Sequence, residues 1–183
     1  VIAENLPTWC ENMKDFTALA DLATPYVGNA SAVGQVLGVS PLASYNYSGM
    51  SLQTTSEPYG IRLNYIIPEP DLYTRTELKQ MADLTALNCF VLIDNLGEVS
   101  LKIDFYYTEE GSIEPFHDAM AIVYQRDDVA ASFGQDVRKF AKEPTQWRDA
   151  VIAYFAADKA VDWYEIEQDE TALQEQQAQV DEG

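Results

Sequence analysis

The residue types that most often carry catalysis are sparse in this sequence. His117 is the only histidine among 183 residues, which excludes an HExxH metallopeptidase motif and leaves one possible partner for a catalytic triad. No serine is followed three positions later by lysine, and KTG and SDN are absent, so the acylatable serine of penicillin-recognising proteins is missing. Neither GxGxxG nor GxxxxGK[ST] occurs. We therefore predict no catalytic residue and no cofactor, with His117 as an exposed loop residue.

Carboxylates are plentiful, and pairs of adjacent acids occur at Glu109-Glu110, Asp127-Asp128, Asp169-Glu170 and Asp181-Glu182. None of these pairs has the alternating ligands and central glycine of an EF-hand loop. We interpret them as solvated faces rather than metal ligands. A carboxylate pair for glycoside hydrolysis stays an alternative in so acidic a chain, although nothing singles one out.

The charge balance restricts the class of partner. Eleven basic against thirty acidic residues give a formal charge of −19, which repels nucleic acid phosphates and anionic lipid headgroups. We expect no nucleic acid partner. No apolar run approaches the roughly 18 residues of a membrane span. The start Val1-Ile2-Ala3-Glu4 carries neither an initiator methionine nor a basic region, which favours a mature segment whose membrane anchor lies upstream.

Cys10 and Cys89 are the only cysteines, and they show neither CxxC nor zinc-ligand spacing. Cys89 lies within an apolar run, so we favour buried thiols over a disulfide, while pairing with Cys10 remains open.

Hydrophobic periodicity predicts the elements that must position any site. An apolar fraction of 47% indicates one packed domain, placed at residues 1–168, followed by an acidic, glutamine-rich tail at 169–183. Expected helices cover residues 8–22, 30–37, 74–94, 128–133, 137–142 and 144–155, and expected strands cover 45–52, 61–67, 99–107 and 120–124. This order, roughly ααββαββα, predicts an α+β fold with an antiparallel sheet of about four strands and helices mainly on one face. A βαβ rhythm with glycine-rich turns is not evident.

Eleven tyrosines stand out, and five of them fall in or beside the expected hairpin: Tyr45, Tyr47, Tyr59, Tyr65 and Tyr73. Phenol rings combine apolar area with a polar tip, which suits saccharide or peptide surfaces. The alternative is that they fill the sheet, because aromatic residues favour strands.

Four segments resemble a known family: TPYVGNASAVG at 24–34, LQTTSEPYG at 52–60, Asn64-Tyr65, and LIDNLGEV at 92–99. Together they resemble an uncharacterised bacterial domain of unknown function, over about residues 22–142. That domain occurs in Gram-positive membrane-anchored proteins and lipoproteins, and beside the metallopeptidase region of BlaR/MecR-type antirepressor regulators. The resemblance implies an extracytoplasmic or cell-surface location and a regulatory setting, but no activity.

We therefore expect a non-enzymatic extracytoplasmic sensor or protein-interaction domain of a membrane-associated bacterial regulator. Its partner would be an unknown protein or a cell-wall-derived ligand. A carboxylate-dependent hydrolase and a purely structural spacer are the alternatives. The candidate binding surface joins the first motif turn to the hairpin and comprises Tyr26, Asn29, Glu57, Tyr59, Asn64 and Tyr65. A scaffold role stays open for these segments, because several of their residues are typical of turns and caps.

Overall fold

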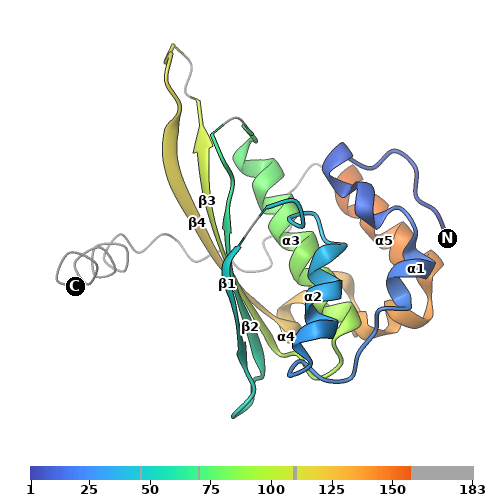
Figure 1. Cartoon of the computed structure of the whole chain (residues 1–183). Coiled ribbons are helices and arrows are strands. Elements are labelled where there is room, and N and C mark those ends of the chain that lie inside the picture. The colour runs from blue at the N-terminus through green and yellow to red at the C-terminus, as the bar shows by residue number, and fades with distance from the viewer. Residues whose placement is uncertain (46, 70, 109–110, 158–183) are drawn as a thin grey trace.

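A four-stranded sheet and a layer of helices on one of its faces make up the fold (Figure 1). The computed structural model describes residues 1–45, 47–69, 71–108 and 111–157. The expected tail at 169–183, the last residues of the expected 1–168 domain and the Glu109-Glu110 pair lie outside the described residues. No helix in the described ranges is long and apolar enough to cross a membrane.

The sheet has the strand order β1-β2-β3-β4, with β1 at Tyr47–Gln53, β2 at Gly60–Ile66, β3 at Glu98–Tyr107 and β4 at Phe116–Gln125. The outer pairs β1–β2 and β3–β4 are antiparallel, as predicted, whereas β2 and β3 are parallel. The predicted α+β fold with a four-stranded, mostly antiparallel sheet is thus confirmed, and the parallel β2–β3 pair is its one exception in the described residues. A long helix carries the chain back along the sheet between β2 and β3, so both strands run in the same direction.

Within the described residues, seven helical segments accompany the sheet: η1 (Thr8–Met13), α1 (Phe16–Ala20), α2 (Ala30–Gly38), α3 (Arg75–Leu92), α4 (Arg126–Phe133), η2 (Val137–Lys142) and α5 (Pro144–Ala156). Two predicted starts are confirmed. The Asn29 side chain accepts from Ala32 N at 3.1 Å, and Thr74 and Glu77 form a reciprocal capping box that opens α3. Gly134 ends α4 in a left-handed conformation with φ of 67°.

The prediction of one continuous helix at 8–22 is wrong, because two separate helical segments lie in this range. Residues from Thr8 form a short 3₁₀ helix without a side-chain cap, and α1 begins later, capped by Asp15. Ala3 N donates to Lys14 O at 2.8 Å, and Phe16 N donates to Val1 O at 2.8 Å. A continuous helix would need those same backbone groups for its own i→i−4 bonds, so pairing with the N-terminal segment interrupts it.

Helix α3 is buried almost all round, as its apolar second half predicts. Its one charged residue at 0% exposure is Asp83, which accepts hydrogen bonds from Tyr124 Oη at 2.7 Å and Tyr154 Oη at 2.8 Å. Lys79 Nζ lies 3.4 Å from the same carboxylate. The Asp83 cluster, as we call these four side chains, therefore ties α3 to β4 and α5.

Both cysteines are buried free thiols. Burial raises the pKa of Cys10 and of Cys89 to about 12, so neither is reactive at neutral pH.

Candidate functional site

The first motif segment docks against the C-terminal end of α3. Thr24 N donates to Leu92 O at 2.7 Å, and Asp94 N donates to Thr24 O at 3.0 Å. Asn95 Oδ1 accepts from Val27 N at 2.7 Å, which fixes the turn before α2. Residues 94–97, which link α3 to β3 and are called the junction below, therefore hold this segment through its backbone.

The second motif segment reaches the same junction from the β1–β2 connection. Tyr59 O accepts from Gly97 N at 2.8 Å and from Glu98 N at 3.1 Å. A Cβ placed on Gly97 would lie only 2.9 Å from Cβ of Pro58, so this approach requires glycine. Segments that lie far apart in the sequence thus meet at one point.

Arg126 caps the C-terminal end of α3, where backbone carbonyls lack helical partners. Its Nε donates to Leu96 O at 2.6 Å, Nη1 to Phe90 O at 2.8 Å and Nη2 to Ile93 O at 2.8 Å. The guanidinium also lies 5.2 Å from the centroid of the Phe90 ring. Burial lowers the pKa of Arg126 to about 10, so it remains charged at neutral pH. The side chain of the first residue of α4 thereby replaces the usual glycine or lysine cap.

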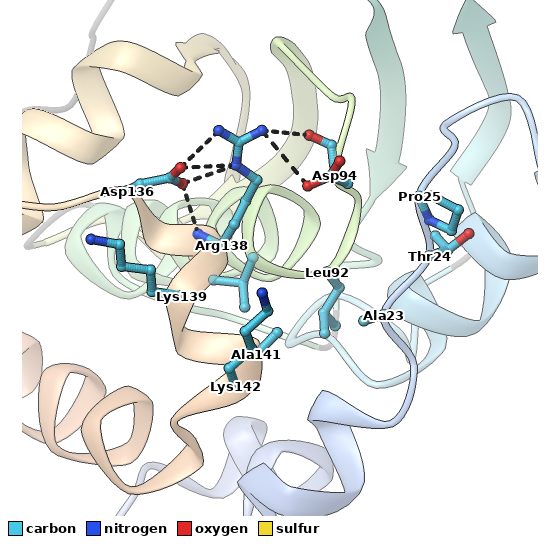
Figure 2. Close-up of a pocket in the computed structure, with 11 residues that line it drawn as sticks. Ala23, Thr24, Pro25, Leu92, Asp94, Asp136, Arg138, Lys139, Ala141 and Lys142 are labelled. Carbon is cyan, nitrogen blue, oxygen red and sulfur yellow. Dashed lines mark hydrogen bonds and ion pairs between the residues drawn. The ribbon is translucent and has the colours of Figure 1, made fainter.

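Arg138 on η2 closes the other side of the junction (Figure 2). Its Nη2 and Nε donate to the Asp136 carboxylate at 2.7 and 3.0 Å, and Nη1 donates to Asp94 O at 3.2 Å. The guanidinium beside Asp136 holds the pKa of that carboxyl below its usual range. Nη1 also lies 3.7 Å from Asp94 Oδ1. The fork geometry fixes Arg138 in one position.

Two cavities flank the Asp94–Arg138 pair, and we call the junction with both of them the junction site. The first, of about 490 Å³, lies between the Thr24-Pro25 segment and η2 (Figure 2) and is lined by Ala23, Thr24, Pro25, Val91, Leu92, Asp94, Asp136, Arg138, Lys139, Ala141 and Lys142. The second, of about 560 Å³, is lined by Glu57, Pro58, Tyr59, residues 94–97, Arg126 and Arg138. Both volumes fall in the range of small-ligand sites.

Four of the six candidate residues lie at or near this site. Glu57 and Tyr59 line the second cavity, while Tyr26 is 50% exposed on the turn that Asn95 holds, and Asn29 caps α2. The other two belong elsewhere. Asn64 is exposed on the face of β2 opposite the helices, away from the junction.

Tyr65 is 1% exposed and points into the core, so its expected place on the binding surface is wrong. The burial of β2 alternates, which puts Tyr65 and its neighbour Asn64 on opposite faces.

Sequence reasoning missed the cationic residues of the site: Arg126, Arg138, Lys139 and Lys142. A signal was present, because four of only eleven basic residues fall within seventeen positions. Helical periodicity explains the apolar residues of this region but does not show that its cations meet the end of a helix more than thirty residues earlier.

Residues that could suggest catalysis lie away from the junction. His117 is on strand β4 rather than in the expected loop, with Nε2 at 3.6 Å from Asp104 Oδ1. Burial raises the pKa of Asp83, but this carboxyl lines neither cavity of the junction site. Among the described residues, no three His, Cys, Asp or Glu side chains gather into a group that could hold a metal ion.

The fold and the junction define a two-layer α+β domain in which loops from distant parts of the chain converge on one helix end. Residues 19–114 match the domain of unknown function DUF4825, and the chain belongs to this family. The match covers both docked motif segments, α3 and β3, whereas Arg126 and the cations of η2 follow it. No curated protein and no solved structure matches the chain.

Proposed function

We propose that this chain is a non-enzymatic binding domain of a membrane-associated bacterial regulator, and that the junction site is its binding surface. The observation that carries the proposal is convergence: the segments at 24–34, 52–60 and 92–99 meet at residues 94–97 and border two adjoining cavities. A set of turns that served only as scaffold would not need exposed side chains such as Tyr26 and Glu57 around such cavities.

The regulatory and extracytoplasmic setting rests on the resemblance to domains found beside BlaR/MecR-type metallopeptidase regions and in Gram-positive membrane-anchored proteins. The ligand would then be a protein partner or a cell-wall-derived molecule. Protease added to intact cells tests the location. We expect cleavage of the full-length protein under conditions that spare a cytoplasmic marker, and protection until lysis would refute an extracytoplasmic position.

Substitution in the full-length regulator at its native locus tests the binding role. We expect Tyr26→Ser combined with Glu57→Lys to abolish regulated transcription without lowering protein abundance, because both side chains are exposed beside the junction. Asn64→Ser is the matched control, since this exposed residue lies on the sheet away from the site.

Equal loss of output in the control and the double variant would argue against a localised surface. Normal output in the double variant would instead favour the spacer alternative. Replacement of the domain by an unrelated fold of similar size would then preserve regulation.

A further inference from the structure

We propose that the first cavity of the junction site binds an organic monocarboxylate, in particular the free C-terminal carboxylate of a short apolar peptide. This inference rests on the proposed function, because it names the ligand class of the same site. Three features of the cavity support it: its net charge, the placement of its lysines and its apolar wall.

The cavity is positively charged in a chain whose formal charge is −19. Arg138, Lys139 and Lys142 face two carboxylates among the lining residues, Asp94 and Asp136, which leaves a formal charge of 3 − 2 = +1. A monocarboxylate neutralises that charge. A phosphate, with about −1.5 to −2 at neutral pH, would leave negative charge beside two aspartates.

The two lysines supply the unused positive charge. Arg138 is engaged by Asp136 and by Asp94 O, as described above, whereas Lys139 and Lys142 make no ion pair with any described residue. Both lie on the 3₁₀ helix η2, three positions apart. In a 3₁₀ helix, side chains at i and i+3 lie on the same side. Lys139 points away from Lys142 in Figure 2, so rotation of its flexible side chain would bring both ammonium groups to one carboxylate.

The cavity wall opposite the lysines is apolar, which favours an organic ligand over an inorganic anion. Five of the lining residues are apolar: Ala23, Pro25, Val91, Leu92 and Ala141. Figure 2 shows Ala23 and Pro25 across the cavity from Lys139 and Lys142. A peptide end with small apolar side chains would place its carboxylate on the lysines and its methyl groups against this wall. The volume of about 490 Å³ accommodates two or three such residues.

Matched peptides test the charge requirement on the full 183-residue chain. The probes are acetyl-Ala-Ala-Ala with a free carboxylate, the same peptide as its amide, and inorganic phosphate. We expect the free acid to shift backbone NMR resonances of residues 137–142 and 92–95. Its binding should weaken as salt is added, because salt screens the attraction between the carboxylate and the lysines. The amide and phosphate should bind at least about tenfold more weakly, the equivalent of one charge-assisted hydrogen bond.

Neutral variants test the lysines. Lys139→Gln and Lys142→Gln should each weaken binding of the acid peptide roughly tenfold at an unchanged melting temperature, because both side chains are exposed. Lys102→Gln is the control: Lys102 is also without an ion pair to a described residue, but it lies on β3, on the face away from the helices. Its affinity should match that of the wild type.

The outcomes separate the ligand class from the binding function. Equal affinity for acid and amide would overturn the carboxylate assignment while leaving a binding site at the junction. Equal shifts with phosphate would overturn the role of the apolar wall. No shift with any probe would overturn this inference, and the transcription assay of the junction variants would still decide the proposed function on its own.

Discussion

Helix α3 carries two polar clusters that differ in what surrounds them. The Asp83 cluster lies inside the protein, where one carboxylate at 0% exposure accepts hydrogen bonds from two tyrosine hydroxyls and pairs with an ammonium group. The junction lies at the end of the same helix, where Arg126 and Arg138 bind backbone carbonyls and Asp136 beside open cavities. Both clusters join elements distant in sequence, but only the second leaves charged groups in reach of a ligand.

The difference shows how one helix supports both stability and recognition. A buried polar network is costly to disturb, because each group left without its partner keeps its full desolvation penalty. At a half-exposed site, water can replace a lost partner, so substitutions there cost less stability and are free to serve binding. We therefore expect substitutions in the Asp83 cluster to lower the free energy of unfolding more than substitutions at the junction.

The largest effect is expected where a charge is buried with no partner built for it. Ile103 on β3 is 0% exposed. Ile103→Asp would place a carboxylate as deep as Asp83 but without its hydroxyl and ammonium donors, at a cost of about 5 kcal/mol or more. Against a total stability of about 5–15 kcal/mol, we expect loss of the cooperative thermal transition. Lys102→Asp, one residue earlier and on the outer face, should melt normally, and similar melting of both variants would contradict the assignment of the two faces.

Removal of the buried carboxylate itself should rank second. Asp83→Ala takes the shared acceptor from Tyr124 and Tyr154 and the counter-charge from Lys79. We expect a loss of about 3–5 kcal/mol, measured by urea unfolding. Asp149→Ala, at an exposed acid on α5, should change stability by no more than about 0.5 kcal/mol. A cost for Asp83→Ala no greater than that of its control would show that the cluster is not a structural tie.

The arginine cap at the junction should matter less than the Asp83 cluster. Arg126→Met removes three hydrogen bonds to the carbonyls of Phe90, Ile93 and Leu96 but keeps an apolar stem over the Phe90 ring. Because the Arg126 side chain that makes these bonds is only partly buried, we expect a loss of about 2 kcal/mol. Arg148→Met on α5 is the control, with its surface pair to Asp149 worth under about 1 kcal/mol. A cost for Arg126→Met above that of Asp83→Ala would reverse the comparison.

The regular elements of the fold could be predicted from the sequence because their signals are local. The alternation from Val99 to Tyr107 identifies β3, and the Thr74–Glu77 capping box identifies the start of α3. The parallel pairing of β2 with β3 could not be predicted in the same way. It depends on where α3 returns the chain, a tertiary property that no residue pattern within either strand encodes.

The candidate site was predicted only in part, for a related reason. Turn residues at 24–29 and 57–60 marked two of the segments that meet, yet nothing local connects them to Arg126 or Arg138. Tyr65 shows the opposite error, since it was predicted to belong to the site but lies in the core. A tyrosine can serve either recognition or packing, and its position in the strand decides which. The missing information was spatial convergence in the first case and the buried face of β2 in the second.

The smallest effect expected is a difference in pH dependence between the two clusters. Burial raises the pKa of Asp83, whereas hydrogen bonds from Arg138 lower the pKa of Asp136. A carboxyl whose pKa is raised in the folded state lowers the stability of the protein as pH rises from the ordinary pKa of 3.8 through the folded-state pKa. A carboxyl with a lowered pKa contributes stability that is present above 3.8 and lost as pH falls through the folded value.

The two asparagine variants should therefore respond to acid in opposite directions. Urea unfolding between about pH 3 and pH 7 measures this, with each variant compared to the wild type at the same pH. The cost of Asp136→Asn should shrink as pH falls below 3.8, because the wild type then loses its charged pair with Arg138. The cost of Asp83→Asn should instead grow as pH falls from the raised folded-state pKa towards 3.8, because the wild-type carboxyl is relieved of its burial penalty once protonated. Parallel curves for both variants would mean that the buried carboxylate is as well compensated as the partly exposed one, and that the contrast between the middle and the end of α3 is one of position rather than of electrostatics.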